Sequence, residues 1–160
     1  MRRSILAAVA ILAAACANTP STTQIAEQNA AVVRRAIEEP WNQKNFDNLS
    51  ELYGAEYVSY TNGQLDTGTV EMRIKDVLTR YPDSRVTVDE VIATADRAVV
   101  RWQWLATDVP TGKPMKIAGT SVMRIADGKI VEGHGNYDLL GATLATGATI
   151  APPAGVLPQK

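Results

Sequence analysis

Apolar residues follow a helical spacing in two segments of the chain, 25–37 and 69–81. In each segment they recur every three or four residues, which places them on one face of a helix. Pro40 and Pro82 follow the two segments, and proline ends or kinks a helix because it lacks a backbone N–H donor. The pattern therefore predicts two amphipathic helices, each with one face able to pack on a sheet.

Shorter elements are predicted around these helices. Thr22 or Thr23 can cap the first helix, and Asp47 can cap a short helix that runs to residue 53. The segment 57–60 reads as a short strand, and Asn62-Gly63 after it reads as a tight turn.

After Pro82 the spacing changes from helical to strand-like. Segments rich in Val, Ile, Thr and Trp alternate with turn residues, and we expect strands at 85–94, 97–107, 114–126 and 129–138. Helices first and an antiparallel meander of strands afterwards is the pattern of an α+β fold.

The segment 97–107 has one strongly apolar face. Side chains alternate between the two faces of a strand, so Trp102 and Trp104 share a face with Val100. Arg101 and Gln103 lie on the other face. We expect both tryptophans to be largely buried against the helices.

The last predicted strand, IVEGHGNYDLL (130–140), has one polar face and holds the only histidine of the chain. A strand with four polar groups on one side lies either against solvent or a dimer partner, or along a polar pocket. We expect the pocket. The polar face carries Glu132, His134, Asn136 and Asp138, and the other face carries Val131, Gly133, Gly135 and Tyr137.

The first residues have the layout of a secretory signal: two arginines, an apolar run too short to span a bilayer, and small residues before Cys16. The segment resembles a lipobox, and Cys16 is the only cysteine. We expect a signal peptide at 1–15, then the lipidated Cys16 with a tether to residue 23, which would anchor the protein to the bacterial envelope membrane on its periplasmic or outer side. The alternative is cleavage at the A-x-A motif and a soluble periplasmic or secreted protein.

Composition excludes several functional classes. The chain has 16 basic and 17 acidic residues without a basic run, so nucleic acid is not an expected partner. The chain has one histidine and no clustered carboxylates, so we expect no metal site. It has no phosphate-binding or dinucleotide motif, so we expect no cofactor.

Three segments of the chain together resemble the SnoaL-like polyketide cyclases of the nuclear-transport-factor-2-like superfamily: WNQKNFDNLSELYGAEYVSY, YPDSRVTVDEVIATADRAVVRW and RIADGKIVEGHGNYDLLG. The resemblance runs from Ile25 to Gly141 and implies a domain at 24–142, followed by an irregular tail at 143–160. It implies a strongly curved antiparallel sheet wrapped around N-terminal helices in a cone, with an internal pocket. It also implies that Asp138 is the acid/base, because that position matches the catalytic aspartate of the characterised cyclases.

These observations lead to one main hypothesis and two alternatives. The main one is a cyclase or isomerase without a cofactor, in which Asp138 moves a proton next to the carbonyl of a hydrophobic small molecule. His134, Tyr57 or Tyr60 would stabilise the enolate. The alternatives are an envelope-anchored binding protein for a hydrophobic ligand and a structural homodimer. The expected catalytic residues are Asp138 and His134, and the expected substrate-binding residues are Asn136, Trp102, Trp104, Tyr57 and Trp41.

Overall fold

The computed structural model describes residues 20–151. The expected signal peptide and Cys16 lie outside the described residues, as does the end of the expected tail. Within 20–151, no helix has the length and apolar character needed to cross a membrane.

Two long helices form at the segments with helical spacing. Helix α1 spans Thr22–Ile37, and helix α3 spans Val70–Arg80. The cap of α1 is Ser21 rather than the expected Thr22 or Thr23. Its hydroxyl accepts from the backbone N–H of Gln24, whose side chain accepts in return from the backbone N–H of Ser21. This capping box satisfies two backbone N–H groups, which a threonine one residue later could not do in the same register.

Two short elements follow α1. Pro40 lies inside a turn of π-helix, η1 (Glu38–Asn42), so the helical path is changed rather than stopped. Helix α2 (Leu49–Leu52) begins after Asn48, and the expected cap at Asp47 is wrong. The backbone N–H of Asp47 instead donates to the side chain of Asn45.

The sheet of the described chain has six strands in the order β2-β1-β6-β5-β4-β3. The expected meander is confirmed, because β3 to β6 pair antiparallel in sequence order. The sheet as a whole is mixed rather than antiparallel, since β1 runs parallel to β6. The strands span Tyr53–Thr61 (β1), Gln64–Leu65 (β2), Arg85–Ala93 (β3), Arg97–Thr107 (β4), Pro114–Ala126 (β5) and Lys129–Tyr137 (β6).

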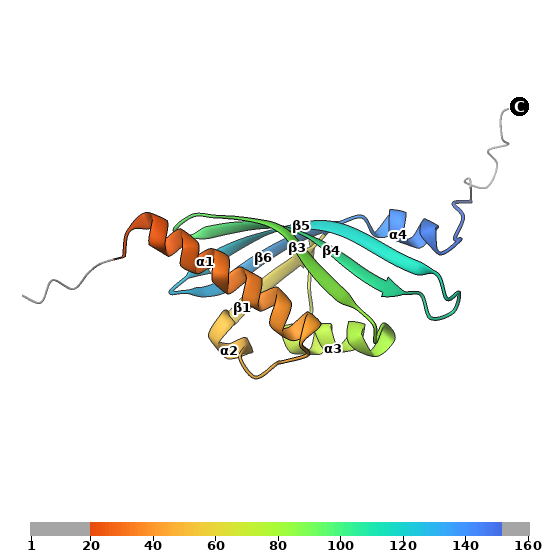
Figure 1. The fold of residues 1–160 in the computed structure, drawn as a ribbon, viewed down its shortest axis with the longest axis horizontal. Helices are drawn as coiled ribbons and strands as arrows, with labels where there is room; N and C mark the ends of the chain where they lie inside the picture. Colours follow the sequence, from red (N-terminus) through yellow and green to blue (C-terminus); the bar gives the residue numbers. More distant parts are fainter. Residues whose placement is uncertain (1–19, 152–160) are drawn as a thin grey trace, which may run out of the picture.

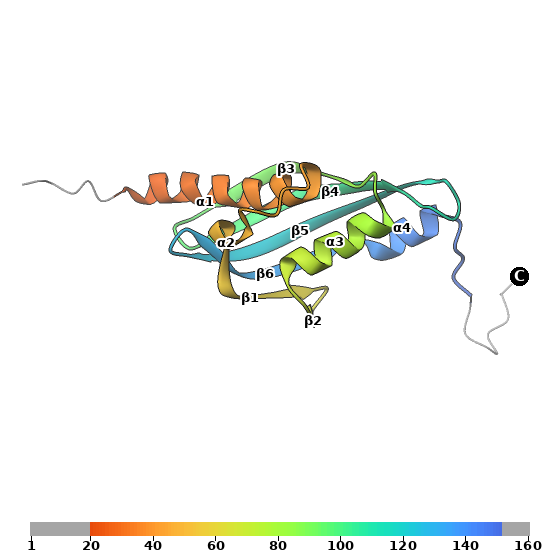
Figure 2. The same ribbon diagram turned by 90° about the horizontal axis from the view of Figure 1, so that it is seen from below.

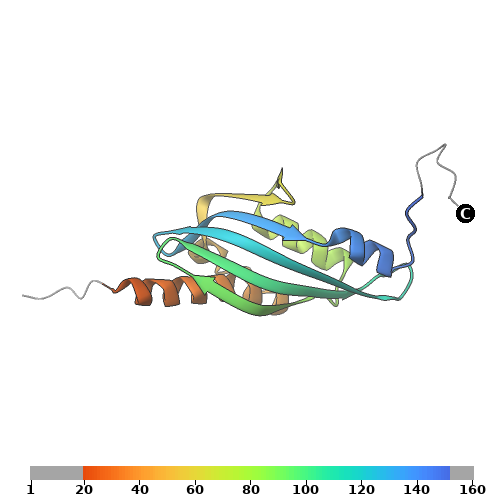
Figure 3. The same cartoon turned by 90° about the horizontal axis from the view of Figure 1, so that it is seen from above.

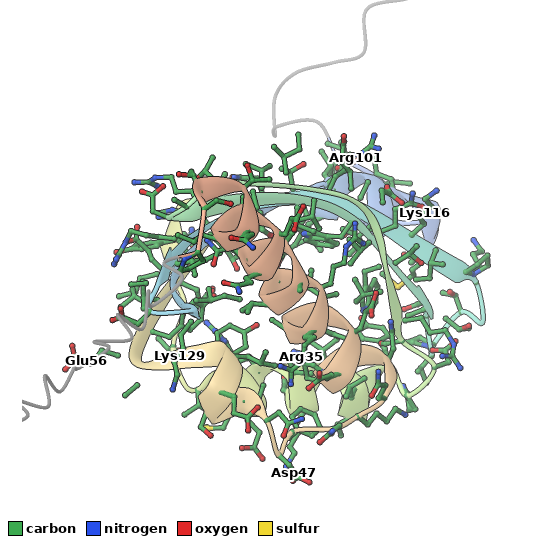
Figure 4. All side chains as sticks on the ribbon, turned by 60° about the vertical axis from the view of Figure 1, so that its left-hand side comes forward. Arg35, Asp47, Glu56, Arg101, Lys116 and Lys129 are labelled. Carbon is green, nitrogen blue, oxygen red and sulfur yellow. The ribbon has the colours of Figure 1, made fainter. Side chains whose placement is uncertain are left out.

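Helices α1, α2 and α3 all lie on one side of the curved sheet (Figures 1 and 2). Seen from the opposite side, the strands lie in front of these helices (Figure 3). Arg101 and Lys116 project on the sheet side, whereas Arg35 and Asp47 belong to the helix side (Figure 4). The final helix, α4 (Leu139–Ala145), lies beyond the end of β6 and extends into the segment expected as an irregular tail from residue 143.

Burial alternates along the central strands and fixes which face is inward. In β4, Val100 and Trp104 are buried and Trp102 is half-buried, while Arg101 is exposed. The predicted orientation of β4 is therefore confirmed. Together with α1, these inward side chains form the core, and the same inward face carries the cavity described next.

Candidate functional site

A cavity of about 530 Å³ lies between the inner face of the sheet and the helices. Its volume falls in the usual range for small-molecule sites, and its wall is mostly apolar and aromatic, as such sites are. The aromatic side chains come from five parts of the fold: Trp41 from η1, Tyr53, Tyr57 and Tyr60 from β1, Tyr81 after α3, Trp102 and Trp104 from β4, and Tyr137 from β6.

Glycines on the sheet make room for these rings. A Cβ on Gly133 would lie 2.5 Å from the hydroxyl of Tyr57, and a Cβ on Gly119 would lie 2.4 Å from Cζ2 of Trp102. Both separations are far below van der Waals contact, so larger residues at these two positions would push the rings out of place. The glycine face of β6 is therefore the inner face, because the ring of Tyr57 from the neighbouring strand β1 covers Gly133.

One polar cluster borders this aromatic cavity. Arg73 of α3 forms an ion pair with Asp66, with 2.9 Å between Nη1 and Oδ2. The same Nη1 donates to Oγ of Ser59 on β1 over 2.6 Å, and that hydroxyl donates to Oδ2 of Asp66 over 2.6 Å. The arginine and aspartate side chains are 29% and 20% exposed, so the pair is only partly shielded from solvent. The cluster ties α3 to β1 at the edge of the cavity.

Tyr57 lies beside this cluster. Burial raises the pKa of its phenol, and nearby Ser59 and Arg73 offset only part of that rise. Burial also raises the pKa of the neighbouring Tyr53, whose ring meets that of Tyr57 edge-on at 4.8 Å. Tyr57 is therefore a neutral phenol near neutral pH, able to donate a hydrogen bond into the cavity.

The two tryptophans of β4 differ in their polar contacts. Nε1 of Trp102 donates to Oγ of Ser121 on β5 over 3.0 Å. Nε1 of Trp104 is buried and has no hydrogen-bond partner among the described residues. Its ring meets Tyr81 edge-on at 5.2 Å.

The structure places the expected aromatic residues around one cavity. Tyr57, Trp41, Trp102 and Trp104 all line it. Their contact with a ligand stays a prediction. Within 20–151, no three His, Cys, Asp or Glu residues come together as a group that could hold a metal ion.

The orientation expected for His134 is wrong. His134 pairs with Val122, which belongs to the outward set of β5. Although His134 is among the residues around the cavity, its side chain is 46% exposed and Nε2 lies 2.8 Å from Oε1 of Glu132. Its ring stacks on Tyr60 at 4.7 Å, and Glu132 is also paired with Arg124. The polar face of β6 is therefore the solvent-facing one.

Asp138, unlike His134, is not among the residues around the cavity. It is the N-cap of α4, and its carboxylate accepts a hydrogen bond from the backbone N–H of Gly141 over 2.7 Å. Asn136 pairs with Thr120, and both side chains are exposed on the outer face. The expected shared pocket of Asp138, His134 and Asn136 does not form, because all three are exposed and the last two lie on the outer side of the sheet. The alternation of a strand sequence separates its two faces but does not determine which face is inward.

Sequence reasoning missed Ser59, Asp66 and Arg73. A partial signal was present: Ser59 has the same parity as Tyr57 and so shares its face of the strand. The ion pair gave no comparable signal, because it depends on how α3 lies against β1.

A model of the SnoaL-like domain family matches residues 33–133, more than half of the 160-residue chain. The chain belongs to the SnoaL-like domain family. The family expected from sequence is thus confirmed, and the cone-shaped α+β fold agrees with it.

Solved structures share the fold of this SnoaL-like protein at low sequence identity. A proposed SnoaL-like polyketide cyclase from Jannaschia sp. CCS1 is 21% identical with a TM-score of 0.68, over 82% of this chain and 100% of that one. IdmH, a proposed polyketide cyclase from Streptomyces antibioticus, is 21% identical with a TM-score of 0.66, over 76% and 99%. An LEH-like epoxide hydrolase of M. tuberculosis is 15% identical with a TM-score of 0.63, over 79% and 92%. A comparison with curated proteins finds no significant match.

Proposed function

We propose that this SnoaL-like protein binds a carbonyl-bearing hydrophobic small molecule in its cavity and moves a proton next to the carbonyl, as a cyclase or isomerase does. The observation that carries the proposal is the cluster of Ser59, Asp66 and Arg73 at the edge of an aromatic cavity. The family match and the relatives described as cyclases support the reaction class.

The chemistry assigns a role to each member of the cluster. Asp66 removes a proton from the carbon next to the carbonyl. In an isomerisation it returns this proton to another carbon of the same molecule. In a cyclisation the enolate carbon attacks a second carbonyl carbon of the molecule and the proton passes to the oxygen of that carbonyl, so neither reaction gains or loses a proton overall. The phenol of Tyr57 donates a hydrogen bond to the carbonyl oxygen, where negative charge develops as the proton leaves. Arg73 pairs with Asp66 and adds positive charge near that oxygen. Asp66 takes the role of base that was expected for Asp138, whose carboxylate caps α4 and does not line the cavity.

A second candidate is a binding protein without turnover. It is favoured by one feature of the cluster: Oδ2 of Asp66 already accepts from Ser59 and pairs with Arg73. This oxygen is therefore already engaged by two partners and is less accessible to a substrate proton. In that case the cluster would serve only to anchor a polar group of the ligand.

One experiment with 1-tetralone, a bicyclic aromatic ketone, separates these candidates. Binding is measured by quenching of tryptophan fluorescence, since Trp41, Trp102 and Trp104 line the cavity. Turnover is measured as deuterium uptake at the carbon next to the carbonyl in D2O. Asp66→Asn should still bind but exchange roughly 100-fold more slowly. Asp127→Asn, in the exposed turn between β5 and β6, is the matched control and should behave as wild type.

Each outcome decides between the candidates. Exchange by wild type and loss in Asp66→Asn support the enzyme. Binding without exchange by wild type supports the binding protein. Exchange at the wild-type rate in Asp66→Asn refutes the assignment of the base, and no binding of the ketone refutes the proposed cavity function.

The place of action is a further part of the proposal. Cys16 follows a signal-like segment, so we propose that lipid on this residue anchors the domain to the envelope membrane. A hydrophobic small molecule would then meet the cavity at a membrane surface.

A further inference from the structure

Ser121 presents an unused hydrogen-bond donor to the cavity. Its Oγ accepts from Nε1 of Trp102 over 3.0 Å, and an indole nitrogen can only donate. The hydroxyl proton of Ser121 is therefore left to point elsewhere, and it finds no acceptor among the described residues. Ser121 is half-buried and lines the cavity, so this proton is available to a ligand.

The register of the sheet fixes where Ser121 lies relative to the polar cluster. On the inner face, Ser59 of β1 is opposite Gly133, and Ser121 of β5 is opposite Gly135. Two strand spacings and a two-residue step along β6 separate the two serines, which gives about 12 Å between their Cα positions. The sheet is curved towards the cavity, so their hydroxyls are closer than that.

Glycines form the floor between the two serines. The phenol of Tyr57 lies over Gly133, and Gly135 carries no side chain below Oγ of Ser121, so a flat molecule can lie between the phenol and this hydroxyl. Trp102, whose ring lies over Gly119 of β5, closes the floor on one side.

We propose that Ser121 forms a second polar subsite, which selects ligands carrying an oxygen acceptor at the end opposite to the carbonyl held by Tyr57 and Arg73. The inference rests on the proposed binding of a carbonyl compound in the cavity. It defines the ligand as a rigid, flat molecule about two fused rings long, with oxygen at both ends. Nε1 of Trp102 already donates to the oxygen of this hydroxyl. Ser121 therefore prefers an ether or carbonyl oxygen, which accepts its proton, over a group that can only donate.

The test uses two probes of similar shape, 6-methoxy-1-tetralone and 6-ethyl-1-tetralone. Both have the carbonyl, but only the first has an acceptor at the far end. Dissociation constants come from tryptophan fluorescence for wild type, Ser121→Ala and Thr120→Ala. Thr120 is the neighbouring residue on the outer face and serves as the matched control, and circular dichroism checks the fold of each variant.

Loss of one hydrogen bond should weaken binding of the methoxy probe to Ser121→Ala by about threefold to tenfold and leave the ethyl probe unchanged. Thr120→Ala should bind both probes as wild type does. Equal effects of Ser121→Ala on the two probes, or no effect on either, would overturn the second subsite while leaving the proposed function intact. If wild type binds neither probe, the proposed function is overturned and this inference with it. If Ser121→Ala misfolds, Ser121→Cys takes its place. A thiol is a weaker hydrogen-bond donor than a hydroxyl, so we expect a smaller loss of affinity, confined to the methoxy probe.

Discussion

Substitution of Gly119 by alanine tests the packing on which the cavity depends. The added Cβ would lie 2.4, 2.6 and 2.8 Å from three atoms of the Trp102 indole. The indole is held by its hydrogen bond to Ser121 and by contact with the ring of Tyr137 at 5.8 Å, so it cannot move without loss. Overpacking of this kind costs about 1–3 kcal/mol. Alanine also restricts the unfolded chain, which offsets about 0.4–1 kcal/mol.

Gly135→Ala is the matched control. Gly135 lies on the same inner face, but its added Cβ would meet only Oγ of Ser121 at 3.5 Å and a backbone oxygen at 3.9 Å, which are ordinary contacts. We therefore expect Gly119→Ala to lower the free energy of unfolding by roughly 1–2 kcal/mol, while Gly135→Ala is neutral or slightly stabilising. Urea unfolding followed by tryptophan fluorescence measures both. Equal stability of the two variants would show that the Trp102 ring does not lie over Gly119.

Three further predictions concern the anchor, the core and the outer face. Cys16→Ser should move the protein from the membrane fraction to the soluble fraction, and a wild type already soluble with an N-terminus beyond Cys16 would exclude lipidation. Trp104→Ala should lower the free energy of unfolding by about 3–5 kcal/mol in urea titrations, because the ring is only 7% exposed; a loss typical of a surface residue would place it outside the core. His134 and then Arg124 lower the pKa of Glu132 below 4.5, so this group stabilises the fold above that pH and loses its effect as the pH falls. Glu132→Gln should therefore lose less stability than wild type on acidification, and identical pH profiles would contradict the pairing.

Local patterns predicted the elements better than their long-range pairing. The helices at 25–37 and 69–81 and the four antiparallel strands have periodic sequences, and they form close to the expected bounds. The strand expected at 57–60 is longer, spanning Tyr53–Thr61, and pairs parallel with β6. Its first half contains Gly54 and Ala55, which have little strand preference, so only the tertiary pairing determines it.

The candidate site was predicted in part. The cavity-lining tryptophans followed from the apolar face of β4, because large apolar side chains on one face of a strand point to the core. The orientation predicted for the last strand is wrong. One face of this strand carries four polar groups and the other carries two glycines, and the polar face predicts the lining of a pocket. The glycine face is inward because Tyr57, from a distant part of the chain, occupies the space above Gly133.

The polar cluster links the chemistry of the cavity to the placement of α3. Ile74 is the one buried residue of that helix and Val77 packs against the core while only partly buried, so few apolar contacts hold the helix. Arg73 is adjacent in sequence and reaches both Ser59 and Asp66, which fixes the helix against β1. A substitution of Asp66 therefore removes the proposed base and also a tether of the cavity wall. Asparagine keeps the shape and the hydrogen-bond acceptor of that tether, whereas alanine removes both. If Asp66→Asn loses deuterium exchange but binds the ketone as wild type does, the loss is due to the missing base. If it loses both exchange and binding, the cavity wall has been disturbed.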